Sequence, residues 1–127
     1  MAGIENIEAY IEDEFRWFHR HPELSYEEVE TTKRIRSSLE RAGIRILDLP
    51  LKTGVVAEVG EGEPLVALRA DIDALPIEEQ TELPYRSESK GRMHACGHDF
   101  HTSSVLGAAL LLKQREKELQ GRVRLFF

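Results

Sequence analysis

Groups suited to metal chemistry are concentrated in the segment His94-Ala95-Cys96-Gly97-His98-Asp99-Phe100-His101. These eight positions hold three of the five histidines, the single cysteine and one aspartate. Imidazole and thiolate are preferred ligands of zinc-like ions, and the glycine between Cys96 and His98 allows both side chains to approach one centre. We therefore predict that Cys96 and His98 bind a metal ion. The alternative is a buried thiol beside histidines that cap a helix.

Two aspartates, Asp71 and Asp73, directly follow an apolar run at residues 65–70. Cys96 and His98 alone are too few for a zinc site, since structural zinc has four protein ligands and catalytic zinc about three plus water. The aspartates are therefore candidates for binding the metal or for orienting a metal-bound histidine. For either aspartate alone, the alternative is a cap on the turn that follows.

Composition excludes several classes of partner. The chain has 127 residues, enough for one small domain or part of a larger one, and its net charge is 17 − 23 = −6. No run of Lys or Arg offers a surface for nucleic acid. The longest apolar stretch, residues 105–112, is far too short to cross a membrane, and the acidic N-terminus does not resemble a secretion signal. A single cysteine cannot form an intrachain disulfide, so we expect a cytoplasmic protein.

Hydrophobic periodicity predicts three helices. The first covers residues 4–18, where apolar side chains recur at spacings of three and four. Ser25 and Glu28 have the spacing of a capping box, which predicts that Ser25 begins a second helix that ends before Gly43. A third helix is expected over residues 102–120.

His19 and His21 fall at the C-terminal end of the first predicted helix. A protonated imidazole interacts favourably with the helix dipole at this end. We therefore interpret both histidines as helix-terminal groups rather than as metal ligands.

Four short β-branched or apolar segments predict strands, at residues 44–47, 54–59, 65–70 and 122–127. A compact turn joins the second and third strands, so we expect them to form an antiparallel hairpin. The third strand, the third helix and the fourth strand follow in order, which predicts a right-handed crossover and a parallel pair. The expected fold class is α/β, with a mixed sheet and an antiparallel edge hairpin.

In open α/β sheets, ligands bind beyond the carboxyl ends of the strands. Asp71 and Asp73 lie at such an end, and Cys96 lies just before the third helix, so we expect these groups to converge. The chain finishes on Phe126 and Phe127 with no turn or polar tail. We interpret residues 1–127 as the N-terminal portion of a longer catalytic domain, whose uncovered apolar edge is expected to self-associate.

Three segments together resemble the metal-dependent amidohydrolases related to aminoacylase and carboxypeptidase. The branch that the chain resembles contains hippurate hydrolase, the plant hydrolases of indole-acetic acid conjugated to amino acids, and N-acetyldiaminopimelate deacetylase. The resemblance extends over nearly the whole chain. The three segments are Phe18-His19-Arg20-His21-Pro22-Glu23-Leu24-Ser25, Leu68-Arg69-Ala70-Asp71-Ile72-Asp73-Ala74-Leu75-Pro76 and Met93-His94-Ala95-Cys96-Gly97-His98-Asp99.

The resemblance implies a zinc-peptidase-like catalytic domain that binds two divalent ions, which are zinc, manganese, cobalt or nickel. By this resemblance Cys96 and His98 are metal ligands, Asp71 is the active-site aspartate and Asp73 is its supporting neighbour. The family's general-base glutamate, its remaining ligands and its lid and dimerisation domain would all lie beyond Phe127.

The implied activity is hydrolysis of small N-acyl amino acids by a metal-activated water, in a homo-oligomeric full-length enzyme. Residues 1–127 alone are then expected to be inactive. One alternative is a non-catalytic metal-binding or interaction module, although structural zinc sites usually contain paired Cys-x-x-Cys motifs. Another is a redox-sensing thiol at Cys96, for which the chain has no resolving cysteine.

Overall fold

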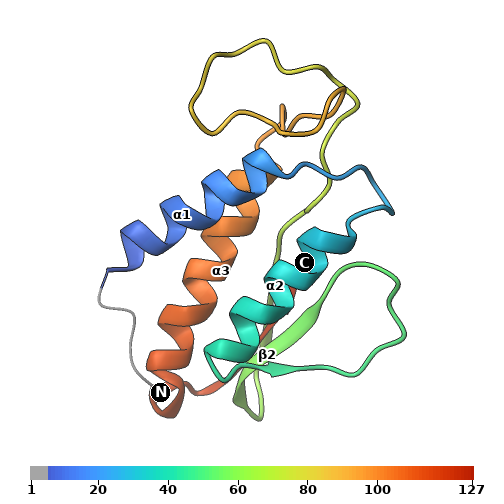
Figure 1. Cartoon of the computed structure of the whole chain (residues 1–127). Helices are drawn as coiled ribbons and strands as arrows, with labels where there is room; N and C mark the ends of the chain where they lie inside the picture. Colours follow the sequence, from blue (N-terminus) through green and yellow to red (C-terminus); the bar gives the residue numbers. More distant parts are fainter. Residues whose placement is uncertain (1–5) are drawn as a thin grey trace.

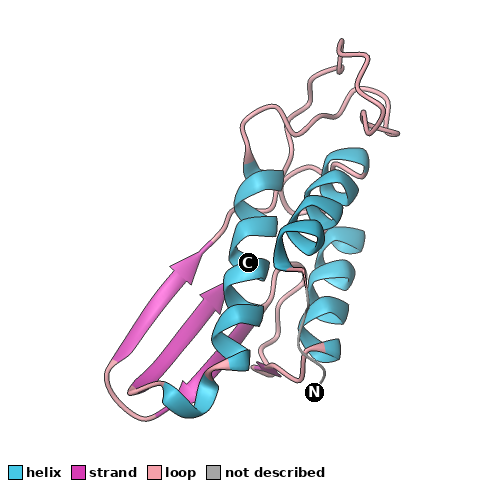
Figure 2. Cartoon of the chain, turned by 90° about the vertical axis from the view of Figure 1, so that its left-hand side faces the viewer, coloured by secondary structure: helices cyan, strands magenta, loops and turns pink. Residues whose placement is uncertain are grey.

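The fold is described from a computed structural model that covers residues 6–127. The helices lie on one side of a four-stranded sheet (Figures 1 and 2). Among the described residues no helix is long and apolar enough to cross a membrane. The elements, in chain order, are α1 (Ile7–Arg20), α2 (Val29–Arg41), β1 (Arg45–Ile46), β2 (Val56–Glu61), β3 (Leu65–Arg69), α3 (His98–Gln114), the short 3₁₀ helix η1 (Glu116–Glu118) and β4 (Gly121–Phe126).

The sheet has the order β1-β2-β4-β3, so the C-terminal strand lies inside it. β3 and β4 are parallel, as the crossover through the third helix predicts, whereas β2 is antiparallel to both β1 and β4. Arg124 shows the arrangement, since it lies opposite Glu58 of β2 and opposite Ala67 of β3. The predicted mixed α/β fold is confirmed.

The predicted hairpin between β2 and β3 is wrong, because β4 lies between these strands. Three residues, 62–64, connect them, and an extended chain of this length spans about 10 Å, which equals two strand spacings. β4 fits closely against this connection. Arg122 N–H donates to the Pro64 carbonyl over 3.0 Å, and a Cβ on Gly121 would lie only 2.3 Å from that same oxygen.

Two predicted helix starts also differ from the structure. Ser25 does not cap the second helix; instead the Glu23 carboxylate accepts hydrogen bonds from the backbone N–H groups of Glu30 and Thr31, over 3.1 and 2.6 Å. The third helix begins at His98, four residues before the predicted position, because Gly97 turns the chain with a φ of +106°. The first helix is confirmed from Ile7 onward, while the earlier part of the prediction lies outside the described residues.

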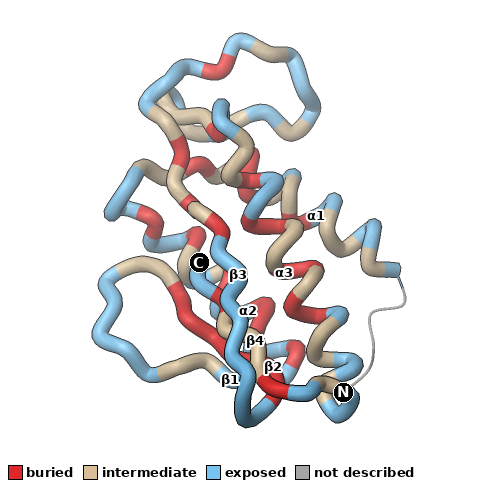
Figure 3. The backbone as a smooth tube through the Cα atoms, turned by 180° about the vertical axis from the view of Figure 1, so that it is seen from behind, coloured by how far each residue is buried: buried red, intermediate tan, exposed pale blue. Residues whose placement is uncertain are grey.

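The hydrophobic core lies between the sheet and the helices. Its fully buried side chains include Phe18 of α1, Leu39 of α2, Leu106 of α3 and Leu125 of β4. β3 is different, since all five of its residues are exposed at the edge of the sheet (Figure 3). This core fixes the N-terminal end of α3 beside the carboxyl end of β3. Self-association through the exposed apolar edge stays a prediction.

Candidate metal and active site

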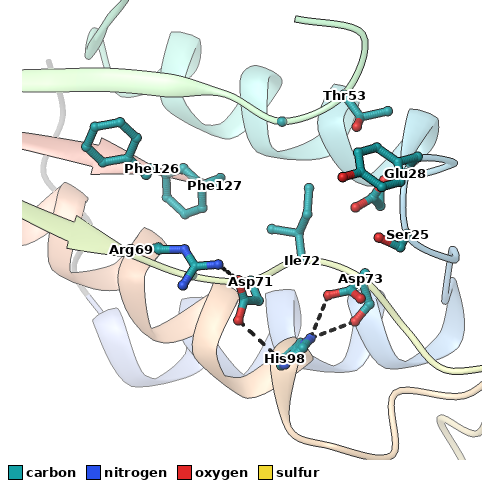
Figure 4. Close-up of a pocket in the computed structure, with 13 residues that line it drawn as sticks. Ser25, Glu28, Thr53, Arg69, Asp71, Ile72, Asp73, His98, Phe126 and Phe127 are labelled. Atoms are coloured by element: carbon teal, nitrogen blue, oxygen red, sulfur yellow. Dashed lines mark hydrogen bonds and ion pairs between the residues drawn. The ribbon is translucent and has the colours of Figure 1, made fainter.

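His98, the first residue of α3, is held in one orientation by the segment after β3. Its Nδ1 lies 2.9 Å from the carbonyl oxygen of Asp73 and 2.9 Å from the carboxylate Oδ1 of the same residue (Figure 4). Both partners can only accept a hydrogen bond, so Nδ1 carries the proton. In the neutral imidazole this places the lone pair on the other ring nitrogen, Nε2, where it can bind a metal ion.

Asp71 lies on the other side of the same imidazole. Its Oδ2 is 3.9 Å from Nε2 of His98, and its Oδ1 forms an ion pair with Arg69. The Thr102 hydroxyl lies 3.1 Å from the Asp71 carbonyl and 2.7 Å from the His98 carbonyl, so it bridges the end of β3 and the first turn of α3. Asp71 and Asp73 thus lie beside His98, whereas the predicted convergence of the aspartates with Cys96 stays a prediction.

Cys96 is an exposed free thiol just before α3, so the predicted alternative of a buried thiol is wrong. Within residues 6–127, no group of three or more His, Cys, Asp or Glu side chains is arranged to hold a metal ion. The donor set nevertheless fits part of a divalent-metal site. A histidine whose Nδ1–H is bound by a carboxylate is the usual form of a metal-ligating histidine, and an accessible thiol two residues away is a suitable partner ligand.

A pocket of about 500 Å³ opens between the carboxyl ends of β3 and β4 and the segment that leads into α2. Glu28, on the wall opposite His98, is only 7% exposed, and its Oε1 is buried without a hydrogen-bond partner. The side chains that define the two walls, shown in Figure 4, are Asp71, Asp73 and His98 on one wall and Ser25, Glu28 and Thr53 on the other.

Comparison with known proteins identifies the family. The model for Peptidase family M20/M25/M40 matches residues 67–127. N-acetylcysteine deacetylase of Bacillus subtilis (strain 168) is 62% identical over 115 residues, which are 88% of this chain and 30% of that protein. The chain belongs to this peptidase family. IAA-amino acid hydrolase ILR1-like 5 of Arabidopsis thaliana is 50% identical over 124 residues, which are 91% of this chain and 28% of that hydrolase.

A solved M20 structure has the same fold. The Bacillus subtilis YXEP protein, described as a dinuclear metal binding peptidase from the M20 family, matches with a TM-score of 0.93 and 57% identity, over 95% of this chain and 35% of that chain. The predicted family and fold class are thus confirmed. The M20 chain spans about 30% of the length of the first curated relative, so the activity of the whole protein is treated below as a proposal.

The M20 chain also contains a buried polar network that the sequence analysis missed. His19 lies in the last turn of α1, as predicted, but its imidazole is buried and contacts two carboxylates instead of the helix end. His19 Nδ1 lies 2.8 Å from a carboxylate oxygen of Asp99, and Nε2 lies 3.1 Å from both carboxylate oxygens of Glu79. His21, the C-cap residue, contacts the helix end itself, since its Nδ1–H donates to the Trp17 carbonyl over 2.7 Å.

His94 occupies the other side of this network. It is buried, and neither ring nitrogen has a hydrogen-bond partner among the described residues. Burial lowers the pKa of His94 to about 4, although the nearby Asp99 carboxylate acts in the opposite direction. The segment 94–101 is therefore not a single ligand cluster, because His94 is buried while Cys96 and His101 are exposed.

Proposed function

We propose that this chain is the N-terminal part of a metal-dependent amidohydrolase that removes the acyl group from N-acyl amino acids. The observation that carries the proposal is the orientation of His98. Its Nδ1–H is bound to Asp73, and Nε2 is directed toward the Asp71 side of the pocket. The similarity to a deacetylase and to an IAA-amino acid hydrolase supports this substrate class.

Two divalent ions, bound with further ligands from the rest of the protein, would supply an activated water and a Lewis acid for the amide carbonyl. In this proposal Cys96 and His98 are metal ligands of this chain. The dinuclear description of the YXEP protein supports the number of ions. Because the described residues contain no complete ligand set, we propose that residues 1–127 alone are inactive.

Asp71 and Asp73 have different roles in this proposal. Asp73 fixes the tautomer and direction of His98, so it acts through the ligand. Asp71 is placed at the pocket surface with its carboxylate fixed by Arg69, where it can orient the reacting water or the substrate amide. We further propose a cytoplasmic homo-oligomer, since a reducing compartment keeps a thiol ligand such as Cys96 available.

The test of this activity uses the full-length protein, loaded in turn with zinc, manganese, cobalt or nickel. We expect release of free amino acid from members of a panel of N-acetyl and N-benzoyl amino acids, and loss of this activity on chelation. If none of the four metal forms cleaves any member of the panel, the amidohydrolase proposal is wrong and a metal-binding module is the better explanation.

The ligand assignment has a separate test in cobalt binding. The Co²⁺-loaded parent should show thiolate charge-transfer absorption that is lost in Cys96→Ser, with an affinity that rises with pH as the thiol loses its proton. His98→Asn should weaken binding, whereas His101→Asn, an exposed histidine on the same helix, is the matched control. Equal spectra for the parent and Cys96→Ser would remove Cys96 from the site.

A further inference from the structure

The network around His19 joins three parts of the chain that are far apart in sequence. His19 lies in the last turn of α1, Glu79 lies in the long loop after β3, and Asp99 lies in the first turn of α3. All three residues are buried, with 5%, 4% and 3% of their surface exposed. The imidazole bridges the two carboxylates with one ring nitrogen each, so α1 is connected to the start of α3 by a direct side-chain contact.

The start of α3 benefits from such a contact because its N-cap residue provides no side-chain hydrogen bond. The N-cap residue, Gly97, has no side chain, and among the described residues the side chain that accepts from a first-turn backbone N–H group is Asp99, which bonds to Phe100. A helix end of this kind frays unless other contacts hold it. The residue at this end is His98, so any displacement of the first turn of α3 moves the imidazole that faces the pocket.

His19 is well suited to hold this end. The Asp99 hydrogen bond, and after it the Glu79 carboxylate, raise the pKa of His19 despite its burial, which favours an imidazolium that donates from both nitrogens. The remaining Asp99 oxygen, Oδ1, accepts from the Phe100 N–H over 2.9 Å, so the carboxylate is held on both sides. The rings of Phe15 and Tyr85 lie near the imidazole, with centroids 6.1 and 5.5 Å from its own.

We propose that His19 is a positioning residue for the metal site, which acts through Asp99 to fix the first turn of α3 and therefore the position of His98. The inference rests on the proposed function only in taking His98 as a metal ligand. His19 does not contact metal or substrate in this proposal. Its effect should therefore be seen in metal affinity and in kcat, with little change in KM.

The structure offers a matched control on the same helix. Glu14 of α1 is also buried, and its carboxylate binds Arg34 of α2 over 2.9 and 3.1 Å. This pair joins α1 to α2 rather than to α3. Glu14→Gln should consequently lower stability as His19→Gln does, without moving His98.

The experiment compares the parent, His19→Gln and Glu14→Gln in the full-length protein. Cobalt affinity is measured by competition with a chromophoric chelator, thermal unfolding of the metal-free protein is recorded, and kcat and KM are determined on an N-acetyl amino acid. We expect His19→Gln to weaken cobalt binding by roughly 10- to 100-fold and to lower kcat, as changes beside a metal ligand commonly do. Glu14→Gln should change cobalt affinity less than about threefold.

Each result decides the inference. If His19→Gln and Glu14→Gln lose stability alike and both keep the parent's cobalt affinity, His19 is merely structural and the inference is overturned. Should His19→Gln fail to fold, Asp99→Asn, which keeps the side-chain shape, must weaken cobalt binding, and unchanged affinity overturns the inference. A parent that binds cobalt but cleaves no substrate refutes the proposed function, whereas a selective loss of affinity in His19→Gln still supports the positioning role.

Discussion

Glu79 and Glu28 are both buried carboxylates, with 4% and 7% of their surface exposed, but their surroundings differ. Glu79 accepts hydrogen bonds from the His19 imidazole, from the Thr81 hydroxyl and, over 2.7 Å, from the Ser87 backbone N–H. Glu28 lies at the pocket wall, and its buried Oε1 accepts none from the described residues.

The difference separates two kinds of region in the molecule. Burial of a carboxylate is unfavourable unless it is bound by donors or cations, and the residues around Glu79 supply them. The region around Glu79 therefore contributes to the stability of the folded protein. On the pocket side, Glu28 and the two aspartates place negative charge around an open space, and Arg69 is the cation that lines it. This arrangement suits a region that completes its interactions with a bound ion or ligand.

The largest expected effect comes from removing the partnered carboxylate. Glu79→Leu should lower the free energy of unfolding by about 3–5 kcal/mol, because it leaves His19 and the Ser87 N–H buried without their acceptor. Urea denaturation of the full-length protein measures the loss. Glu82→Leu, an exposed neighbour in the same loop, is the control. Equal losses in the two variants would contradict the assigned role of Glu79.

The pocket carboxylates should affect rate instead of stability. Asp71→Asn keeps the shape of the side chain and removes its charge, so kcat should fall by roughly 10- to 100-fold, which equals about 1.4–2.7 kcal/mol, while the melting temperature changes little. Steady-state kinetics on an N-acyl amino acid that the parent cleaves will show this. An unchanged kcat, or a loss of stability comparable to that of Glu79→Leu, would count against the separation of the two regions.

A smaller effect of opposite sign is expected at Glu28. Glu28→Gln replaces a carboxyl group, whose Oε1 is buried without a partner, by a neutral amide, and should stabilise the metal-free protein by about 1 kcal/mol. The matched control is Glu27→Gln, which changes the adjacent exposed residue. Destabilisation by Glu28→Gln in urea denaturation would show that Glu28 already has a partner in the folded protein.

The smallest expected effect is a gradual dependence of stability on pH. The pKa of His19 is raised above 6.5, so its contribution is complete below pH 6.5 and is lost as pH rises through the raised value. Burial alone would raise the pKa of Glu79, but bonds from Thr81, the Ser87 N–H and His19 lower it below 4.5, so its contribution is lost as pH falls through that lowered value. The decline above pH 6.5 should be weaker in His19→Gln. Parallel profiles for parent and variant would contradict this assignment.

The fold and half of the candidate site follow from local patterns. Periodicity predicts the helices, and the order of strand, helix and strand predicts the parallel pair β3 and β4. Because ligands bind beyond the carboxyl ends of strands in open α/β sheets, Asp71 and Asp73 are expected near the start of the third helix, where His98 lies. These inferences succeed because each depends on residues within one element or on the chirality of one crossover.

What the sequence does not predict depends on distant partners. His19 is 60 residues from Glu79 and 80 residues from Asp99, and each is a polar residue of a kind that is usually exposed. No spacing within one element reveals that three such residues meet in the interior. The hairpin prediction fails for a related reason, since β4, which separates β2 from β3, begins only at Gly121.

The position of β4 also determines when the sheet can form during synthesis. Among the described strands β3 pairs with β4 alone, β2 pairs with β1 at only two residues, and Phe126 leaves the ribosome last of the residues in these four strands. Until then the segment 56–69 lacks the strand that lies between β2 and β3 in the finished sheet. Because contacts between distant segments slow folding, we expect helical structure in α1 and α2 to form early and the sheet to appear in a single late step.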